Sequence, residues 1–193
     1  MIRASQGNVV DAIEPSAVKR ALPSARGELA AGAALPVCFE LPLRVYYEDT
    51  DAGGIVYYAN WLRFFERART DWLRSLGAVH TQMGREHGLA FVVRELSVDY
   101  RRPAHLDDEL IVDVRLAEAR GASWLLWQSA RRRGEDDPLV AALVRIAAVR
   151  RDDGRPAGIP RWLQQSLAGQ ARHNTPSAAD SPQSQAASRG PAS

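Results

Sequence analysis

Three acidic residues and two adjacent glycines share the short segment EDTDAGG, and this combination could carry chemistry. The acids are Glu48, Asp49 and Asp51, and the glycines are Gly53 and Gly54. A carboxylate can act as a nucleophile or as a general base, and glycines allow the backbone to approach a ligand closely. A helix that starts after such a loop presents free N–H groups and the positive end of its dipole. A carboxylate beside preorganised backbone donors could support acyl transfer.

The same composition is also common in ordinary turns, where acids only solvate the chain. The elements predicted around the loop must therefore decide between a loop that carries chemistry and an ordinary turn. After the loop, the segment WLRFFERARTDWLRSL places apolar residues three or four positions apart, which predicts one helix with a single apolar stripe. Asn60 is expected to cap the start of this helix, and Gly77 is expected to end it.

Alternating segments before and after the helix predict five strands. LPLRVYYE precedes the loop, and four longer segments follow the helix: LAFVVRELSVDYRR, DELIVDVRLAEAR, ASWLLWQSARRR and PLVAALVRIAAVRR. One long helix followed by strands predicts an α+β fold in which an antiparallel sheet wraps the helix. One helix covers only part of such a sheet, so Trp124 and Trp127 are expected to be exposed and to favour self-association.

The composition predicts one domain with an extension at each side. The chain has 193 residues, of which 46% are hydrophobic and 25% charged, as in ordinary globular proteins. Residues 1–40 show no sustained period and are expected to be a flexible extension. Residues 166–193 contain almost no large apolar side chains and are expected to be disordered. The domain is therefore expected to span residues 41–165.

Charge and titratable residues exclude several classes of protein. The net charge is only +2, and the sequence shows no concentrated basic stretch. No nucleic-acid partner is therefore expected. No apolar run reaches the roughly 20 residues of a membrane helix. Cys38 is the single cysteine, which fits a reducing cytoplasm. The four histidines lack metal-ligand spacing, so no metal site is expected. They are His80, His87, His105 and His173.

Three quoted segments resemble one known family. RVYYEDTDAGGIVYYANWLRFFERARTDWLR, AFVVRELSVDYRRPAHLDDEL and ARGAS resemble the 4-hydroxybenzoyl-CoA thioesterase family, and most closely its YbgC type, encoded beside the Tol–Pal envelope system. The resemblance covers about Leu41 to Arg151. It implies a hotdog fold assembled as a dimer or tetramer, and acyl-CoA hydrolysis in the cytoplasm without a cofactor. A link to Tol–Pal or lipid-synthesis proteins is a further implication.

The resemblance also implies residue roles. Asp51 matches the catalytic carboxylate of the family, and its role as nucleophile or general base stays open. The thioester carbonyl is expected to accept the backbone N–H of Tyr58. Members linked to Tol–Pal usually carry His at this position, whereas the hydroxybenzoyl type also carries Tyr. The alternative function is a hotdog module that binds acyl-CoA or an envelope-associated protein without turnover.

Four further residues are candidates for the site. Asn60 is expected to support the carbonyl site in addition to capping the helix. Glu66 could be a helix carboxylate of the kind that some hotdog thioesterases use as the base, or it could simply pair with Arg69 or Arg63. Arg120 and Ser123 flank the turn at which family members bind CoA, and Arg suits phosphate. An ordinary solvated turn is the alternative there. The acyl chain is not identified by the sequence.

Overall fold

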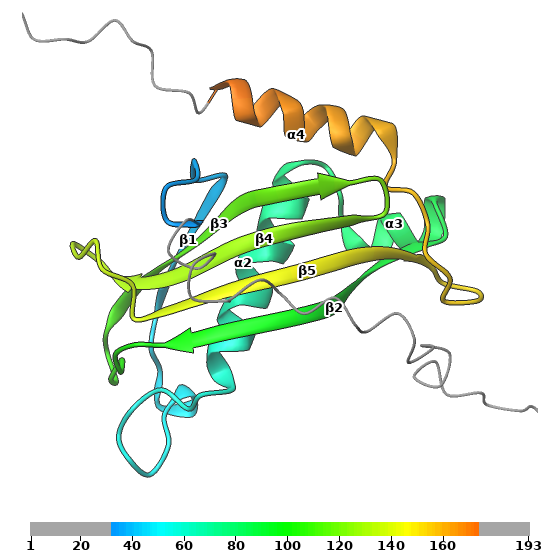
Figure 1. The fold of residues 1–193 in the computed structure, drawn as a ribbon. Helices are drawn as coiled ribbons and strands as arrows, with labels where there is room; N and C mark the ends of the chain where they lie inside the picture. Colours follow the sequence, from blue (N-terminus) through cyan, green and yellow to red (C-terminus); the bar gives the residue numbers. More distant parts are fainter. Residues whose placement is uncertain (1–31, 174–193) are drawn as a thin grey trace, which may run out of the picture.

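The computed structural model describes residues 32–173, which form one antiparallel sheet wrapped around a long helix (Figure 1). The strands lie in the order β1-β3-β4-β5-β2. The predicted α+β hotdog fold, with five antiparallel strands and a central helix, is confirmed. The elements are β1 (Phe39–Arg44), η3 (Tyr47–Asp49), α2 (Asn60–Ser75), α3 (His80–Glu86), β2 (Leu89–Tyr100), β3 (Glu109–Arg120), β4 (Ser123–Arg132), β5 (Val140–Arg150) and α4 (Arg161–His173).

Helix α2 buries the predicted apolar stripe against the sheet. Its buried apolar residues are Trp61, Phe64, Phe65, Ala68, Trp72 and Leu73. Gly77 follows the C-cap of the helix and stops it, as predicted, because this residue has a positive φ of 89°. The Gly77 N–H donates to Arg74, and the Ala78 N–H donates to Leu73. These two bonds satisfy carbonyls of the last turn in a Schellman motif.

The expected capping role of Asn60 is wrong. The cap position is Ala59, and no side chain caps the helix there. Asn60 instead lies in the first turn, and its side-chain amide points back to the preceding loop. It donates to the carbonyl of Asp49 over 2.9 Å and to that of Glu48 over 3.4 Å. The side chain therefore ties the loop to the helix.

The expected exposure of two tryptophans is also wrong. Trp124 is 1% exposed and contacts Trp72 of α2, with ring centroids 5.7 Å apart. Trp127 is 2% exposed on the opposite face of the sheet, where it packs with Ala141 and Leu143. The Arg115 guanidinium lies 4.9 Å from its ring centroid. Neither ring is a free surface for self-association.

Two helices and one boundary differ from the sequence prediction. Residues 80–86 form helix α3, which was not predicted from the sequence. Helix α4 extends past residue 165, the expected end of the domain, to His173. The first strand ends at Arg44 and gives way to the short helix η3. The expected extensions at 1–31 and 174–193 lie outside the described residues.

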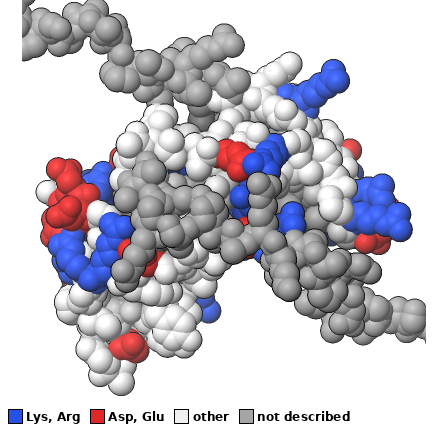
Figure 2. Space-filling view, viewed as in Figure 1, with Lys and Arg blue, Asp and Glu red and all other residues white. Residues whose placement is uncertain are grey.

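Charged side chains of opposite sign lie side by side on the face shown in Figure 2 and elsewhere on the described surface. Arg132 pairs with Asp108 over 2.8 Å, and Arg102 pairs with Glu135 over 2.9 Å. Such pairing reduces the concentrated positive potential on which binding to a phosphate backbone depends.

Candidate active site

Asp49 holds the loop between β1 and α2 in shape. Its carboxylate is buried and accepts the Tyr46 N–H over 2.9 Å. Its carbonyl accepts the Tyr57 N–H and the Asn60 side chain, each over 2.9 Å. All these bonds are made within the loop and the first helical turn. Asp49 is therefore a residue that shapes the turn, and its carboxylate is not presented to solvent.

We expect Asn60→Ser to separate the two interpretations of Asn60. Serine caps helices about as well as asparagine, so a capping role would survive the change. The serine hydroxyl is too short to replace the contact with the Asp49 carbonyl. We expect a loss of about 1–2 kcal/mol in the free energy of unfolding, measured by urea denaturation. An unchanged midpoint would restore the capping interpretation.

Asp51 lies near the tip of the loop, exposed to solvent. The loop doubles back through a bridge between Thr50 and Val56. The Asp51 Oδ1 accepts the Gly53 N–H over 2.8 Å, and no described residue donates a hydrogen bond to its Oδ2. A Cβ at position 53 would lie 3.0 Å from Oδ1, so glycine suits this close approach. Gly54 has a positive φ of 74°, which glycine adopts without strain.

A tyrosine pair follows the Asp51 loop and lies just before α2. The rings of Tyr57 and Tyr58 have centroids 4.6 Å apart. Hydrogen bonding with the Tyr58 phenol raises the pKa of Tyr57, and the negative charges of Tyr58 and Asp51 add to the effect. The bridge between Thr50 and Val56 and the hydrogen bond from the Tyr57 N–H to the Asp49 carbonyl return the chain to the base of the Asp51 loop just before Tyr58. Within residues 32–173, the backbone N–H of Tyr58 has no acceptor.

Glu66 is engaged in a structural network. It forms an ion pair with Arg69 and accepts the Thr70 hydroxyl over 3.0 Å. The buried Arg69 also donates to the Gln128 side chain over 2.8 Å. The expected helix ion pair with Arg69 is therefore present. One side of Glu66 still lines a groove of about 460 Å³ between α2 and β1.

Arg120 and Ser123 lie far from the Asp51 loop within one chain. Arg120 ends β3, whose first residue, Glu109, pairs with Arg44 immediately before the loop. A strand of this length separates its ends by roughly 37 Å at about 3.4 Å per residue. Arg120 is 65% exposed and forms an ion pair with Glu118. One chain therefore does not bring the predicted CoA-binding turn to the Asp51 loop.

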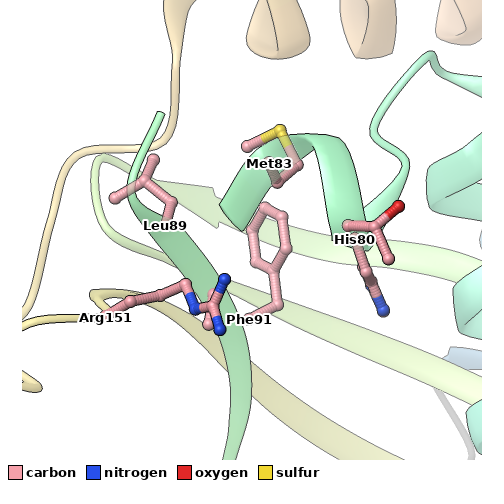
Figure 3. A pocket seen from close by; sticks show the side chains of 7 residues that line it. His80, Met83, Leu89, Phe91 and Arg151 are labelled. Carbon is pink, nitrogen blue, oxygen red and sulfur yellow. The ribbon is translucent and has the colours of Figure 1, made fainter. Parts of the chain in front are cut away.

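A second hollow, of about 280 Å³, was not predicted from the sequence. Figure 3 shows Met83, Leu89 and Phe91 around it, with His80 and Arg151 at its edge. It lies where α3 meets the first residues of β2, at the other end of that strand from Tyr100. This hollow could have been predicted only if residues 80–86 had been recognised as a helix. Their polar composition hides that helix in the sequence.

No group of three or more His, Cys, Asp or Glu side chains in residues 32–173 is arranged to hold a metal ion. No helix within those residues is long and apolar enough to cross a membrane.

Comparisons with known proteins agree on one kind of relative. The family model of the thioesterase-like superfamily matches residues 45–167. The chain is 45% identical over 126 residues to the acyl-CoA thioesterase YbgC of Haemophilus influenzae, covering 65% of this chain and 91% of that protein. It is 47% identical over 90 residues to the acyl-CoA thioester hydrolase YbgC of Escherichia coli, covering 47% of this chain and 66% of that protein. A probable thioesterase from Bartonella henselae superposes with a TM-score of 0.58 at 38% identity, covering 63% of this chain and 98% of that chain.

Proposed function

The chain belongs to the thioesterase-like superfamily, and we propose that it hydrolyses acyl-CoA thioesters to a free acid and CoA. The names of its relatives support this activity, since the proteins of H. influenzae and E. coli are acyl-CoA thioesterases. The observation that carries the proposal is the exposed Asp51 carboxylate in the loop that folds back just before Tyr58 and the start of α2. One of its two oxygens stays free of hydrogen bonds within the described chain.

Asp51 can act in either of two ways. As a general base it takes a proton from water, whose oxygen attacks the thioester carbon. As a nucleophile it attacks that carbon itself and forms an anhydride, which water then hydrolyses. In both cases the C–S bond breaks, its electron pair leaves with the CoA sulfur, and the sulfur takes up a proton. The Gly53 N–H holds Oδ1, which leaves Oδ2 available for the reaction.

The Tyr58 N–H is the donor for the developing negative charge on the carbonyl oxygen. It is free within the described chain and lies just before the N-terminus of α2, where the helix dipole favours negative charge. A donor fixed before the reaction costs no reorganisation when the charge develops. Because the backbone makes this contact, Tyr can replace the more usual His at this position.

A second copy of the chain would join the CoA-binding turn to the catalytic loop. Strand β2 is an edge of the sheet, and it exposes Val92, Val93, Leu96 and Tyr100. A two-fold axis can pair two such edges antiparallel, which brings the start of one β2 to the end of the other. Ser123 lies across from Ala147, and Ala147 across from Val92, so it belongs to the starting end. Tyr100, at the other end, contacts Tyr58.

This arrangement supports a homo-oligomer, a dimer or tetramer, as the active species. Within one protomer, the Asp51 loop and the Arg120–Ser123 turn are too far apart for one CoA molecule. Between two protomers paired along β2, they come to the same side of the assembly. The proposed CoA-binding role of Arg120 and Ser123 therefore depends on the partner.

Thiol release from a panel of aliphatic and aromatic acyl-CoAs tests the proposed activity. We expect steady turnover of at least one member, detected with a thiol reagent, and no dependence on added metal. The panel also identifies the acyl chain that the site prefers. No cleavage of any member, together with a stable protein partner in a pull-down, would favour the alternative of a non-catalytic binding module. Cytoplasmic location and a link to Tol–Pal or lipid-synthesis proteins stay predictions.

A further inference from the structure

Tyr100 is the feature of the site to which neither the resemblance nor the comparisons assign a role. It is the last residue of β2, and its hydroxyl donates to the backbone carbonyl of Tyr58 over 3.1 Å. Burial raises the pKa of Tyr100, and the nearby Tyr58 phenol adds to the rise. The phenol therefore keeps its proton and remains a donor at neutral and moderately alkaline pH.

The carbonyl that Tyr100 binds belongs to the same planar peptide as the Ala59 N–H. Fixing the carbonyl therefore fixes the direction of this N–H. The Ala59 N–H has no acceptor within residues 32–173, and Ala59 occupies the cap position of α2. Accepting a hydrogen bond at the carbonyl also polarises the amide and strengthens its N–H as a donor.

The preceding peptide is arranged in the same way. The Tyr57 carbonyl accepts the Asn60 N–H over 2.8 Å, and it shares its peptide with the free Tyr58 N–H. Two successive N–H groups are thus unpaired within the described chain, and each belongs to a peptide whose carbonyl is held. Two adjacent, oriented donors suit an oxyanion better than one.

We propose that Tyr100 is a positioning residue for thioester cleavage, which orients the Ala59 N–H as a second donor to the carbonyl oxygen beside the Tyr58 N–H. This inference rests on the proposed function. Tyr100 touches neither the substrate nor Asp51 in this assignment. It acts through the Tyr58–Ala59 peptide, so its contribution is made in the transition state, when charge develops on the oxygen.

Tyr100→Phe tests the inference, because it removes only the hydroxyl. Interactions made in the transition state lower kcat when they are lost, and leave KM unchanged. We expect kcat for the preferred acyl-CoA to fall about tenfold, less than the loss of a whole oxyanion donor, while KM stays within about twofold. Tyr47→Phe is the matched control, since the exposed Tyr47 hydroxyl makes no hydrogen bond within the described chain. It should keep the parent kcat.

A double variant tests the route through the peptide. Ala59 has a φ of −75°, which proline can adopt, and Ala59→Pro removes the free N–H. If Tyr100 acts through that N–H, Tyr100→Phe should cost little further activity in the Ala59→Pro protein. If the two substitutions lower kcat by independent factors that multiply in the double variant, this route is contradicted. If Ala59→Pro does not fold, as judged by circular dichroism, the single Tyr100→Phe variant decides.

The failure of the inference differs from the failure of the proposed function. A parent protein that cleaves acyl-CoA, with a Tyr100→Phe variant that matches it in kcat, overturns the inference alone. A parent protein without turnover overturns both. A rise in KM with an unchanged kcat would assign Tyr100 to substrate binding and would also overturn the inference. Size-exclusion chromatography of both variants checks that the assembly is the same.

Discussion

Replacing Asp51 by asparagine is expected to lower kcat by at least about 100-fold, the low end for a positioned acid–base group. Asparagine keeps the Oδ1 atom that accepts the Gly53 N–H, so the loop keeps its shape. The variant loses only the negative charge and the basic oxygen. Steady-state thiol release from the preferred acyl-CoA measures the change. KM should stay close to the parent value, because CoA is bound elsewhere.

Glu48→Gln is the matched control for this loss. Glu48 lies three positions earlier in the same loop, is exposed, and its carboxylate makes no hydrogen bond within the described chain. The change removes the same charge without touching the proposed site. We expect kcat within about twofold of the parent, as for most surface substitutions. Equal losses in both variants would mean that the loop's total charge matters, and that Asp51 has no specific role.

Replacing Val93 by aspartate is expected to break the assembly and, with it, the activity. Val93 is 47% exposed on the edge strand β2. Paired edges would bring two carboxylates together in an apolar contact, and like charges at an interface cost several kcal/mol. The dissociation constant should rise by at least about 100-fold, since each 1.4 kcal/mol is a factor of ten. Analytical ultracentrifugation measures the assembly, and thiol release at the same concentrations measures activity.

Val93→Thr is the control for this variant, because threonine keeps the β-branched shape of valine and carries no charge. It should keep the oligomer and the parent rate. A Val93→Asp protein that becomes monomeric and still turns over at the parent rate would show that one chain holds a complete site. An aspartate variant that stays oligomeric would place the interface on another surface.

Much of the fold and the position of the Asp51 loop could be predicted from the sequence because their signals are local. The apolar stripe of α2 and the alternation in β3 and β5 depend on residues a few positions apart. The stop at Gly77 depends on a single backbone conformation. The Asp51 loop could be found because its acids and glycines adjoin one another in the chain.

The failures concern partners that are distant in sequence. Asn60 suits a helix cap, but its acceptors at Glu48 and Asp49 become visible only when the loop folds back. The burial of Trp124 depends on which face of β4 meets α2, and alternation does not fix that choice. The separation of Arg120 from Asp51 follows from the direction of β3. The bond from Tyr100 to the Tyr58 carbonyl joins residues 42 positions apart.

The most direct measurement is a crystal structure of the protein with a non-hydrolysable acyl-CoA analogue. We expect its carbonyl oxygen at about 2.7–3.1 Å from the Tyr58 nitrogen, the range for an oxyanion donor. The Asp51 carboxylate should face the carbonyl carbon directly or through one water. A carbonyl group held in the groove beside Glu66, with Asp51 remote from it, would contradict the assignment and make Glu66 the leading carboxylate.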